Sequence, residues 1–305
     1  MQTFTFIVAK EDSGQRLDVF LSKVLPKNTS RTFIQSLIRQ GKVTVNHELC
    51  KAHKKVKEGD QFKVEFEAAS LITVKPQKLP LKIIYEDPDL IVVDKPVGMV
   101  VHPAAGNASG TLVNALLYHC KKLSNVNEPL RPGIVHRLDK DTSGVMVVAK
   151  NNATHNFLAQ QFAEHTISRK YIALVNGNVE LDEGIIDLPL GRSRHDREKM
   201  TVTFDQSRQA QTVYKVIGRA KSFTTLEILP RTGRTHQIRV HLAYLGHPVL
   251  GDAKYGRQAS FGRLALHAAV LGFVHPKTGK YMEFSSPLPK EFASHFPNLK
   301  KFLRR

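Results

Sequence analysis

The first part of the chain contains two stretches in which apolar residues recur at helical spacing. Between residues 17 and 25 they fall at i, i+3, i+4, i+7 and i+8, which predicts a helix that ends before Pro26. A second such stretch covers residues 33–38, with Ser30 suited to the N-cap and Gly41 to the position after the last turn. The pattern predicts a pair of helices.

The pattern then changes from helical spacing to alternation. Apolar and polar residues alternate at 43–45 and again at 62–66, which predicts short strands on either side of a turn. Residues 68–80 show neither periodicity and contain two prolines. We therefore expect a small module at 14–67, a linker at 68–80 and a larger body at 81–305.

The larger body mixes strand and helix patterns. Helices are predicted after the capping residues Thr111 and Thr235, and a hairpin over 273–284. Strand patterns occur at 83–85, 90–93, 145–148, 171–175 and 223–229. Because strands and helices do not alternate regularly, the sequence favours an α+β fold over a doubly wound sheet.

Charge changes this picture more than overall composition does. The 305 residues carry 45 Lys and Arg against 27 Asp and Glu, a net charge of +18. An excess of this size indicates a polyanionic partner, of which nucleic acid is the commonest, although an indifferent basic surface is the alternative. We expect the larger body to bind the polyanion directly, because residues 190–240 alone contain 11 basic and 4 acidic residues.

The sequence lacks the motifs that are typical of several classes of protein. Two cysteines form neither a disulfide framework nor a Cys-x-x-Cys pair, and there is no His-Glu-x-x-His, phosphate-binding loop or dinucleotide fingerprint. No apolar run reaches the roughly 18–20 residues that span a bilayer, and the N-terminus does not resemble a secretory signal. We expect a cytoplasmic protein with no cofactor, no metal and no membrane partner.

Two segments remain as candidates for chemistry. Residues 133–144 place a carboxylate beside an arginine just before an apolar strand, and residues 233–239 place an arginine at the start of a helix, where backbone N–H groups favour anions. From the residues alone, Asp139 is more often a turn or ion-pair residue than a nucleophile, and the same interpretations apply to Asp141. Arg234 is more often a phosphate or surface contact.

The first of these segments resembles a known signature. His136-Arg137-Leu138-Asp139 followed by Thr142-Ser143-Gly144 resembles the motif of the RluA-type pseudouridine synthases. Further segments of that family match at 85–103, 169–171, 233–242 and 246–252, so the resemblance covers most of residues 80–285. It implies a mixed, mainly antiparallel sheet flanked by helices, and an isomerase that converts uridine in RNA to pseudouridine.

The N-terminal module contains the segments Arg16-Leu17-Asp18, Ser30-Arg31, Gly41-Lys42-Val43, Val45-Asn46 and Gly59-Asp60. Through these segments it is similar to the S4-type RNA-binding fold. The combination resembles the RluD branch, which implies 23S large-subunit ribosomal RNA as the partner, free or in a pre-assembled large subunit, and we expect a monomer. The residues that we expect to bind RNA are basic or polar positions of the module and of a candidate gripping loop in the body: Arg16, Ser30, Arg31, Lys42, Arg192, Arg194 and Lys199.

The resemblance also implies roles at the site. Asp139 matches the essential carboxylate and Arg234 the arginine that pairs with it. Arg137 matches the residue that occupies the place vacated by a flipped base, and Tyr171 the residue that packs against the uracil. Ile238 is expected to line the pocket. Whether Asp139 attacks the sugar, attacks the base or removes a sugar proton stays open.

Two other functions compete with this reading. A non-catalytic ribosome-assembly factor would use the S4-type module alone and would not need Asp139 or the Thr-Ser-Gly turn. A nucleoside glycosylase or hydrolase would also break a glycosidic bond, but it would release free uracil.

Overall fold

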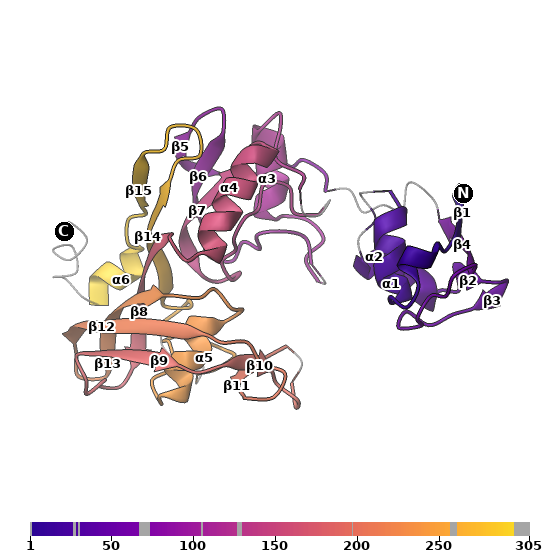
Figure 1. Cartoon of the computed structure of the whole chain (residues 1–305). Coiled ribbons are helices and arrows are strands. Elements are labelled where there is room, and N and C mark those ends of the chain that lie inside the picture. The colour runs from indigo at the N-terminus through magenta and orange to yellow at the C-terminus, as the bar shows by residue number, and fades with distance from the viewer. Residues whose placement is uncertain are drawn as a thin grey trace. The chain divides into compact units, whose positions relative to one another are not determined.

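The computed structural model describes residues 2–26, 29, 31–66, 74–104, 106–126, 130–196, 198–256 and 261–295. Ser30 and residues 67–73 of the expected linker lie outside the described residues. The chain divides into two compact units, Met1–Lys75 with Asn127–Pro132, and Pro76–Val126 with Gly133–Arg305 (Figure 1). Each unit is described by itself.

The N-terminal unit combines an antiparallel sheet with two helices. Its strands run in the order β1 (Gln2–Ile7), β4 (Gln61–Phe66), β2 (Val43–Val45) and β3 (Glu48–Leu49). A short 3₁₀ helix, η1 (Lys10–Asp12), precedes α1 (Leu17–Val24) and α2 (Arg31–Arg39). Both helices lie where the apolar spacing predicts them.

The apolar faces of these elements form one core. Leu17, Phe20 and Leu21 of α1 pack with Phe62 and Val64 of β4, and each of these side chains is at most 1% exposed. The helical spacing and the strand alternation therefore point toward the same interior.

The larger unit is built on a nine-stranded sheet, counted over the described residues. The path through the sheet is β5 (Lys82–Glu86), β6 (Leu90–Lys95), β7 (Ser143–Ala149), β14 (Leu266–Val274), β8 (Ser168–Asn176), β13 (Phe223–Pro230), β12 (Gln211–Arg219) and β9 (Glu183–Asp187). A further strand, β15 (Tyr281–Ser285), pairs with β14 as the predicted hairpin. The described neighbours are antiparallel except for β7 and β14.

The parallel seam between β7 and β14 involves two residue pairs, His267 with Ser143 and Ala268 with Gly144. Gly144 has φ +120°, and a Cβ atom there would lie 2.1 Å from the carbonyl oxygen of Ala268. Only glycine fits this approach. The glycine of the Thr-Ser-Gly turn is therefore what lets the loop before β7 enter the sheet beside β14.

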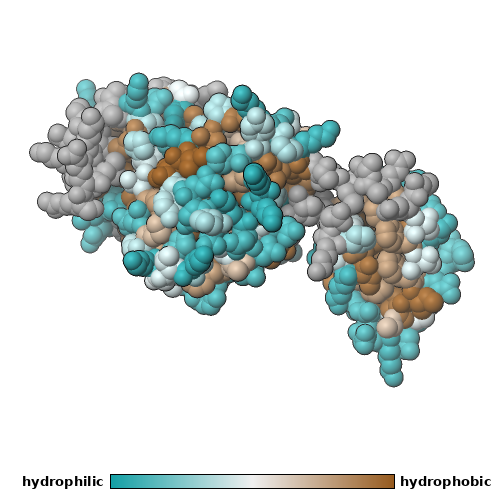
Figure 2. Space-filling model, turned by 90° about the horizontal axis from the view of Figure 1, so that it is seen from above, coloured by the Kyte–Doolittle hydropathy of each residue, from teal (hydrophilic) through white to brown (hydrophobic). Residues whose placement is uncertain are grey.

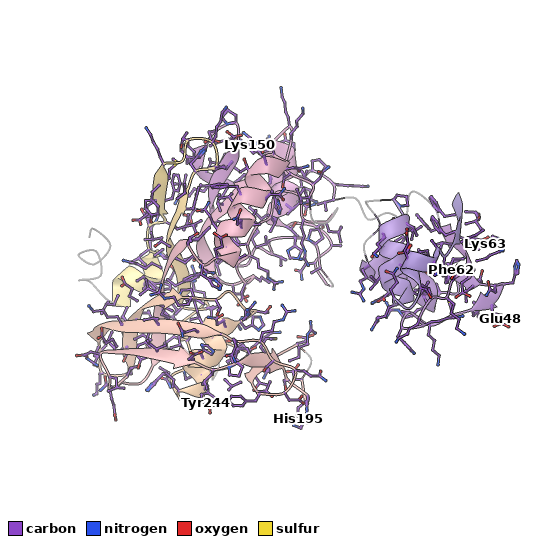
Figure 3. The ribbon with its side chains drawn as sticks, in the orientation of Figure 1. Glu48, Phe62, Lys63, Lys150, His195 and Tyr244 are labelled. Atoms are coloured by element: carbon purple, nitrogen blue, oxygen red, sulfur yellow. The ribbon has the colours of Figure 1, made fainter. Side chains whose placement is uncertain are left out.

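The larger unit also contains a hairpin formed by β10 (Leu190–Arg192) and β11 (Met200–Val202), and helices that cover the sheet. They are α3 (Leu112–His119), α4 (Asn152–Ala163), α5 (Gln237–Tyr244) and α6 (Lys290–His295). α4 lies against β7, and α5 contacts β11 and β12 (Figure 1). His195 lies at the outer end of the hairpin, and Lys150 at the opposite end of the unit (Figure 3).

The predicted caps have different outcomes. Thr111 caps α3 as expected, with its side chain accepting a hydrogen bond from the N–H of Asn114. Thr235 was expected to cap the helix at 235–245, and this is wrong, because His236 is the N-cap in a left-handed conformation, φ 56°. The side chain of Gln237 accepts from the N–H of Arg234 and holds the preceding loop instead.

The fold class predicted from the sequence is confirmed: helices and mostly antiparallel strands are mixed in an α+β arrangement. The visible face of the larger unit is mostly hydrophilic, with small hydrophobic areas (Figure 2). Among the described helices, none has both the length and the apolar character that crossing a bilayer requires.

Candidate active site

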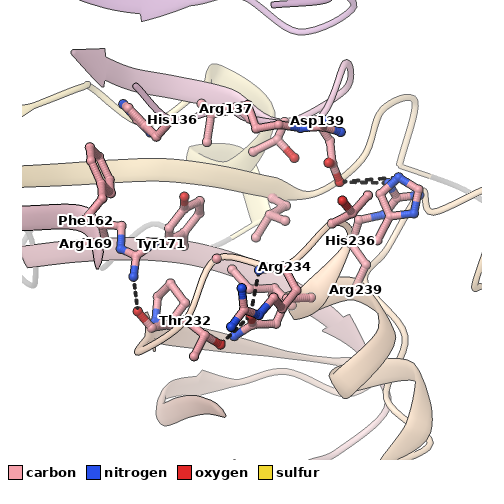
Figure 4. A pocket seen from close by; sticks show the side chains of 18 of the residues that line it. His136, Arg137, Asp139, Phe162, Arg169, Tyr171, Thr232, Arg234, His236 and Arg239 are labelled. Atoms are coloured by element: carbon pink, nitrogen blue, oxygen red, sulfur yellow. Dashed lines mark hydrogen bonds and ion pairs between the residues drawn. The ribbon is translucent and has the colours of Figure 1, made fainter. Parts of the chain in front are cut away.

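A cleft of about 470 Å³ opens in the larger unit between the loop before β7 and the start of α5. The loop contributes His136 to Asp139, β8 contributes Arg169 and Tyr171, and the other wall runs from Gly233 to Arg239 (Figure 4). Four of the sequence-predicted residues of the body line this cleft with Asp139: Arg137, Tyr171, Arg234 and Ile238.

The carboxylate of Asp139 lies inside the cleft, with 16% of the side chain exposed. Its Oδ2 atom accepts a hydrogen bond of 3.0 Å from Nη1 of Arg239. The Nε2 atom of His236 lies 3.9 Å from the same oxygen. A charge-assisted bond of this length orients the carboxylate in the cleft.

Arg239 is itself held by Asp252. Its Nε and Nη2 atoms donate to the two carboxylate oxygens at 2.7 and 2.9 Å, and the Asp252 side chain is fully buried. Burial acts to lower the pKa of Arg239, but its hydrogen bonds to Asp252 and the charge of Asp139 outweigh this effect and raise that pKa above its usual value. Arg239 is therefore a fixed cation that connects two carboxylates.

The predicted pairing of Arg234 with Asp139 is wrong, because Arg239 occupies that place. Arg234 lies in the loop before α5, where its Nε donates to the carbonyl of Gln209 at 3.1 Å. Arg239 lies within the first turn of α5 and points toward Asp252 and Asp139. Arg234 still lines the cleft and is half-buried.

The loop that carries Asp139 is fixed from beneath by Lys95. The Lys95 side chain is fully buried, and its Nζ donates to the carbonyl oxygens of Pro96, Met99 and Lys140 at 2.9 to 3.0 Å. Burial lowers the pKa of Lys95 to about 7, while the nearby carboxylates of Asp141 and Asp139 act in the opposite direction. Three carbonyl acceptors match the three N–H bonds of the ammonium form.

Tyr171 and Ile238 supply the apolar wall beside Asp139. Tyr171 lies on β8 and is half-buried, and burial raises the pKa of its hydroxyl. Ile238 lies on α5 and is 7% exposed. An aromatic face opposite a branched aliphatic side chain suits a planar ring.

The far end of the cleft is closed by His136, Phe162 and Arg169. The His136 and Phe162 rings stack with centroids 4.6 Å apart, and His136 Nε2 accepts a hydrogen bond from the N–H of Val147. Burial lowers the pKa of His136 to about 3. At neutral pH His136 is therefore an uncharged hydrogen-bond acceptor in this part of the cleft.

A second cleft of about 490 Å³ adjoins the first at Asp139. Arg137, Asp139, His236 and Arg239 line both clefts. Arg137 is exposed, and its side chain makes no hydrogen bond to the residues that the structure describes. Its guanidinium can therefore move between the two clefts.

Two of the expected RNA-binding residues of the N-terminal unit, Arg16 and Arg31, form a small ionic cluster with Asp18. Arg16 and Arg31 each contact the carboxylate of Asp18 at 3.0 Å, and about half of each arginine side chain stays exposed. Burial acts against the charge of Asp18, but hydrogen bonds from Arg16, Gln35 and Arg31 lower its pKa to about 2. Lys42 is exposed.

The expected gripping loop coincides with the hairpin β10–β11. Arg192 and Arg194 are exposed, and Lys199 is partly exposed. Arg194 pairs with Asp205, and Lys199 lies 4.0 Å from Asp196. Exposed ion pairs contribute little to stability, so these cations stay accessible to phosphates.

Two groups of potential metal ligands occur in the described part of the larger unit. Glu86, His119 and Cys120 form one, and a second consists of Asp87, Asp89 and His275. Neither group shares a residue with the lining of the two clefts. Lys150 already binds Glu86 at 2.9 Å.

Comparison with protein families gives two matches. Residues 89–244 match a family described as RNA pseudouridylate synthase, and residues 15–62 match the S4 domain. The first match contains the segments 136–139 and 233–239, and the second contains Arg16, Arg31 and Lys42.

Known proteins resemble the chain over nearly its full length. An uncharacterized RNA pseudouridine synthase of Bacillus subtilis, YlyB, is 46% identical over 99% of each chain. The ribosomal large subunit pseudouridine synthase D of Zymomonas mobilis is 44% identical over 98% of each. The structure of human RNA pseudouridylate synthase domain containing 1 aligns with a TM-score of 0.59 at 27% identity, covering 75% of this chain and 96% of that one.

Proposed function

Since this chain belongs to the RNA pseudouridylate synthase family, we propose that its cleft isomerises uridine in large-subunit ribosomal RNA. The protein is an isomerase that makes pseudouridine in RNA, and the relatives named ribosomal large subunit pseudouridine synthase D support the choice of RNA. The observation that carries the site assignment is the Asp139 carboxylate, held in the cleft by Arg239.

In this proposal Asp139 is the catalytic carboxylate. The C1′–N1 bond of uridine breaks, the uracil turns, and a C5–C1′ bond forms while the proton from C5 replaces the lost substituent at N1, so atoms and electrons balance without a co-reactant. A carboxylate acts as a nucleophile or base only when ionised, and the guanidinium of Arg239 at 3.0 Å stabilises that charge. Attack on the sugar, attack on the base and removal of a sugar proton are all compatible with this position.

The nucleotide must leave the RNA stack to reach the cleft, at a cost of a few kcal/mol. We assign Arg137, which is exposed at the mouth of both clefts, to the place that the base vacates. Tyr171 stacks on the uracil, and such stacking contributes about 1–3 kcal/mol. Ile238 packs against the ring, and Arg234 contacts a phosphate or base at the rim.

The rest of the chain grips RNA. We assign the module 14–67 to the RNA outside the cleft, joined by the linker 68–80 to the catalytic body 81–305. Arg16, Ser30, Arg31 and Lys42 contact RNA from the module, with Arg192, Arg194 and Lys199 from the hairpin β10–β11. The protein works as a monomer in the cytoplasm, on free RNA or on a pre-assembled large subunit.

Replacement of Asp139 tests the function. Asp139→Asn should bind a 23S RNA fragment about as well as the unchanged protein and form no pseudouridine, as measured by release of tritium from [5-³H]uridine RNA. Asp141→Asn is the matched control, because Asp141 is exposed two residues away on the same loop. Product formation by Asp139→Asn at the unchanged rate would remove Asp139 from the reaction.

The same assay separates the other functions. A glycosylase would release free uracil, which chromatography detects, whereas an isomerase keeps the base attached. A non-catalytic assembly factor would bind RNA and leave every uridine unchanged. Mapping pseudouridines in ribosomal RNA from cells with and without the gene identifies the sites.

A further inference from the structure

The side chain of His236 faces Asp139 where the two clefts meet. Its Nε2 atom is 3.9 Å from Oδ2 of Asp139, which is too far for a hydrogen bond. Within the described ranges, no group accepts a hydrogen bond from Nε2 of His236. His236 therefore lines the cleft with Nε2 beside the reacting carboxylate, and Figure 4 marks this 3.9 Å contact with a dashed line.

The backbone of His236 is in an uncommon conformation. Its φ of 56° and ψ of 17° place it in the left-handed region, although it is not a glycine. Such residues cost free energy and tend to occur at functional sites, where the surrounding structure enforces them. The conformation directs the imidazole into the cleft instead of along α5.

The other ring nitrogen is fixed by Tyr255. Nδ1 of His236 lies 2.8 Å from the Tyr255 hydroxyl oxygen, which also accepts a hydrogen bond from the N–H of Met200 at 2.9 Å. The phenol has one proton to donate, and among the residues that the structure describes, Nδ1 is the acceptor within reach. The hydroxyl therefore donates to Nδ1, and Nδ1 carries no proton.

The surroundings of His236 favour the neutral imidazole. Burial lowers the pKa of His236 below its usual value and the Arg239 cation adds to this, against the opposing effect of Asp139. A neutral imidazole has one N–H. With Nδ1 occupied by the Tyr255 proton, that N–H is on Nε2, the atom next to Asp139.

Tyr255 fixes both neighbours of Asp139. Its ring lies under the guanidinium of Arg239, with 5.1 Å between Cζ and the ring centroid, and meets the His236 ring edge to face. Its backbone N–H donates to Asp252, the carboxylate that holds Arg239. One tyrosine thus positions the cation and the imidazole together.

We infer that His236 is a neutral hydrogen-bond donor to the flipped uracil, with Tyr255 as the residue that sets its tautomer. This inference rests on the proposed function. Each route open to Asp139 moves an electron pair into the base, so negative charge develops on a uracil carbonyl oxygen. A fixed Nε2–H stabilises that charge without transferring its proton.

Single-turnover rates and RNA affinities of the full chain test this role. His236→Ala should form pseudouridine about 10²-fold more slowly, with RNA affinity unchanged, because one donor to the developing charge is lost. His236→Gln should regain most of the rate, because its amide nitrogen reaches close to the position of Nε2. Tyr255→Phe keeps the ring under Arg239 and should be slowed about 10-fold. His247→Ala is the control, because His247 bonds to Asn176 outside both clefts.

Nitrogen-15 NMR of labelled histidine provides a readout that a packing role would not change. The unchanged protein should show His236 protonated on Nε2, and Tyr255→Phe should show a tautomer mixture. An Nδ1–H tautomer in the unchanged protein, or His236→Ala at the full rate, would overturn the inference. Asp139→Asn distinguishes a failure of this inference from a failure of the proposed function. If Asp139→Asn is inactive while His236→Ala is fully active, only the inference on His236 fails. If Asp139→Asn is fully active, the proposed role of Asp139 fails, and if the unchanged protein forms no pseudouridine, the proposed function fails. Should His236→Ala not fold, the glutamine and phenylalanine variants decide.

Discussion

The carboxylate of Asp139 and the guanidinium of Arg239 form a 3.0 Å hydrogen bond across a separation of 100 residues. The bond joins the loop before β7 to the first turn of α5, and Asp252 fixes the arginine from behind. Because its two hydrogen bonds to buried Asp252 hold Arg239 in place, the arginine sets where the Asp139 carboxylate points.

Arg239→Gln should lower kcat by about 10²-fold, because a carboxylate displaced by about 1 Å loses its alignment with the nucleotide. It should also reduce the free energy of unfolding by about 3–5 kcal/mol, because buried Asp252 loses its partner. The double variant Arg239→Gln, Asp252→Asn should recover stability but not kcat. Arg234→Gln removes the proposed rim contact to RNA, so it should raise KM and keep kcat. A larger loss of kcat there than in Arg239→Gln would contradict the assignment.

Tyr171→Ala should lower kcat/KM by about 5- to 150-fold, the equivalent of about 1–3 kcal/mol of stacking. Tyr171→Phe keeps the aromatic face and should stay within a few-fold of the unchanged protein. Steady-state kinetics on an RNA stem-loop would measure both. Equal losses in the two variants would show that the hydroxyl matters and the stacking does not.

Gly144→Ala should destabilise the larger unit by about 2–5 kcal/mol, because the new Cβ would lie 2.1 Å from the Ala268 carbonyl oxygen. Gly279→Ala offers a comparison, since Gly279 also has a positive φ, +66°, but its Cβ would meet nothing within 4 Å. That change should cost about 1–2 kcal/mol. Urea unfolding followed by circular dichroism measures the difference, and equal costs would contradict a steric requirement at the seam.

His136 should make the protein less stable as the pH falls. Its folded-state pKa of about 3 lies below the unfolded value of 6.5, so between these limits only the unfolded chain binds the proton. The free energy of unfolding should drop by about 1.4 kcal/mol per pH unit from this residue as the pH falls below about 6.5. His136→Gln can still accept from Val147 and should show a shallower slope between pH 6.5 and 4.5. An unchanged slope would mean that His136 is protonated in the folded protein.

The elements with strong periodicity were predictable from the sequence. The helices α1 and α2, the buried strand β7 and the hairpin β14–β15 lie where apolar spacing places them. Local spacing encodes which face of an element is buried, and burial drives these elements to form. The order of strands is not local information, so the insertion of β14 between β7 and β8 could not be inferred.

The site was predictable as a set of segments but not as a set of contacts. Asp139, Tyr171 and Ile238 line one cleft as the family resemblance implies. The choice between Arg234 and Arg239 depends on where α5 begins and on the buried Asp252, and neither follows from spacing. Tyr255 was missed as well, because only the folded chain brings its hydroxyl to His236.

The position of β14 has a consequence during synthesis in the cell. A ribosome that has translated 260 residues has already made Asp139, Tyr171 and Arg239, but not the strand that lies between β7 and β8. Contacts between such distant parts of a chain form late and slowly. The nascent polypeptide therefore carries Asp139, Tyr171 and Arg239 before the sheet that joins them can form, and modification begins only after β14 has been translated.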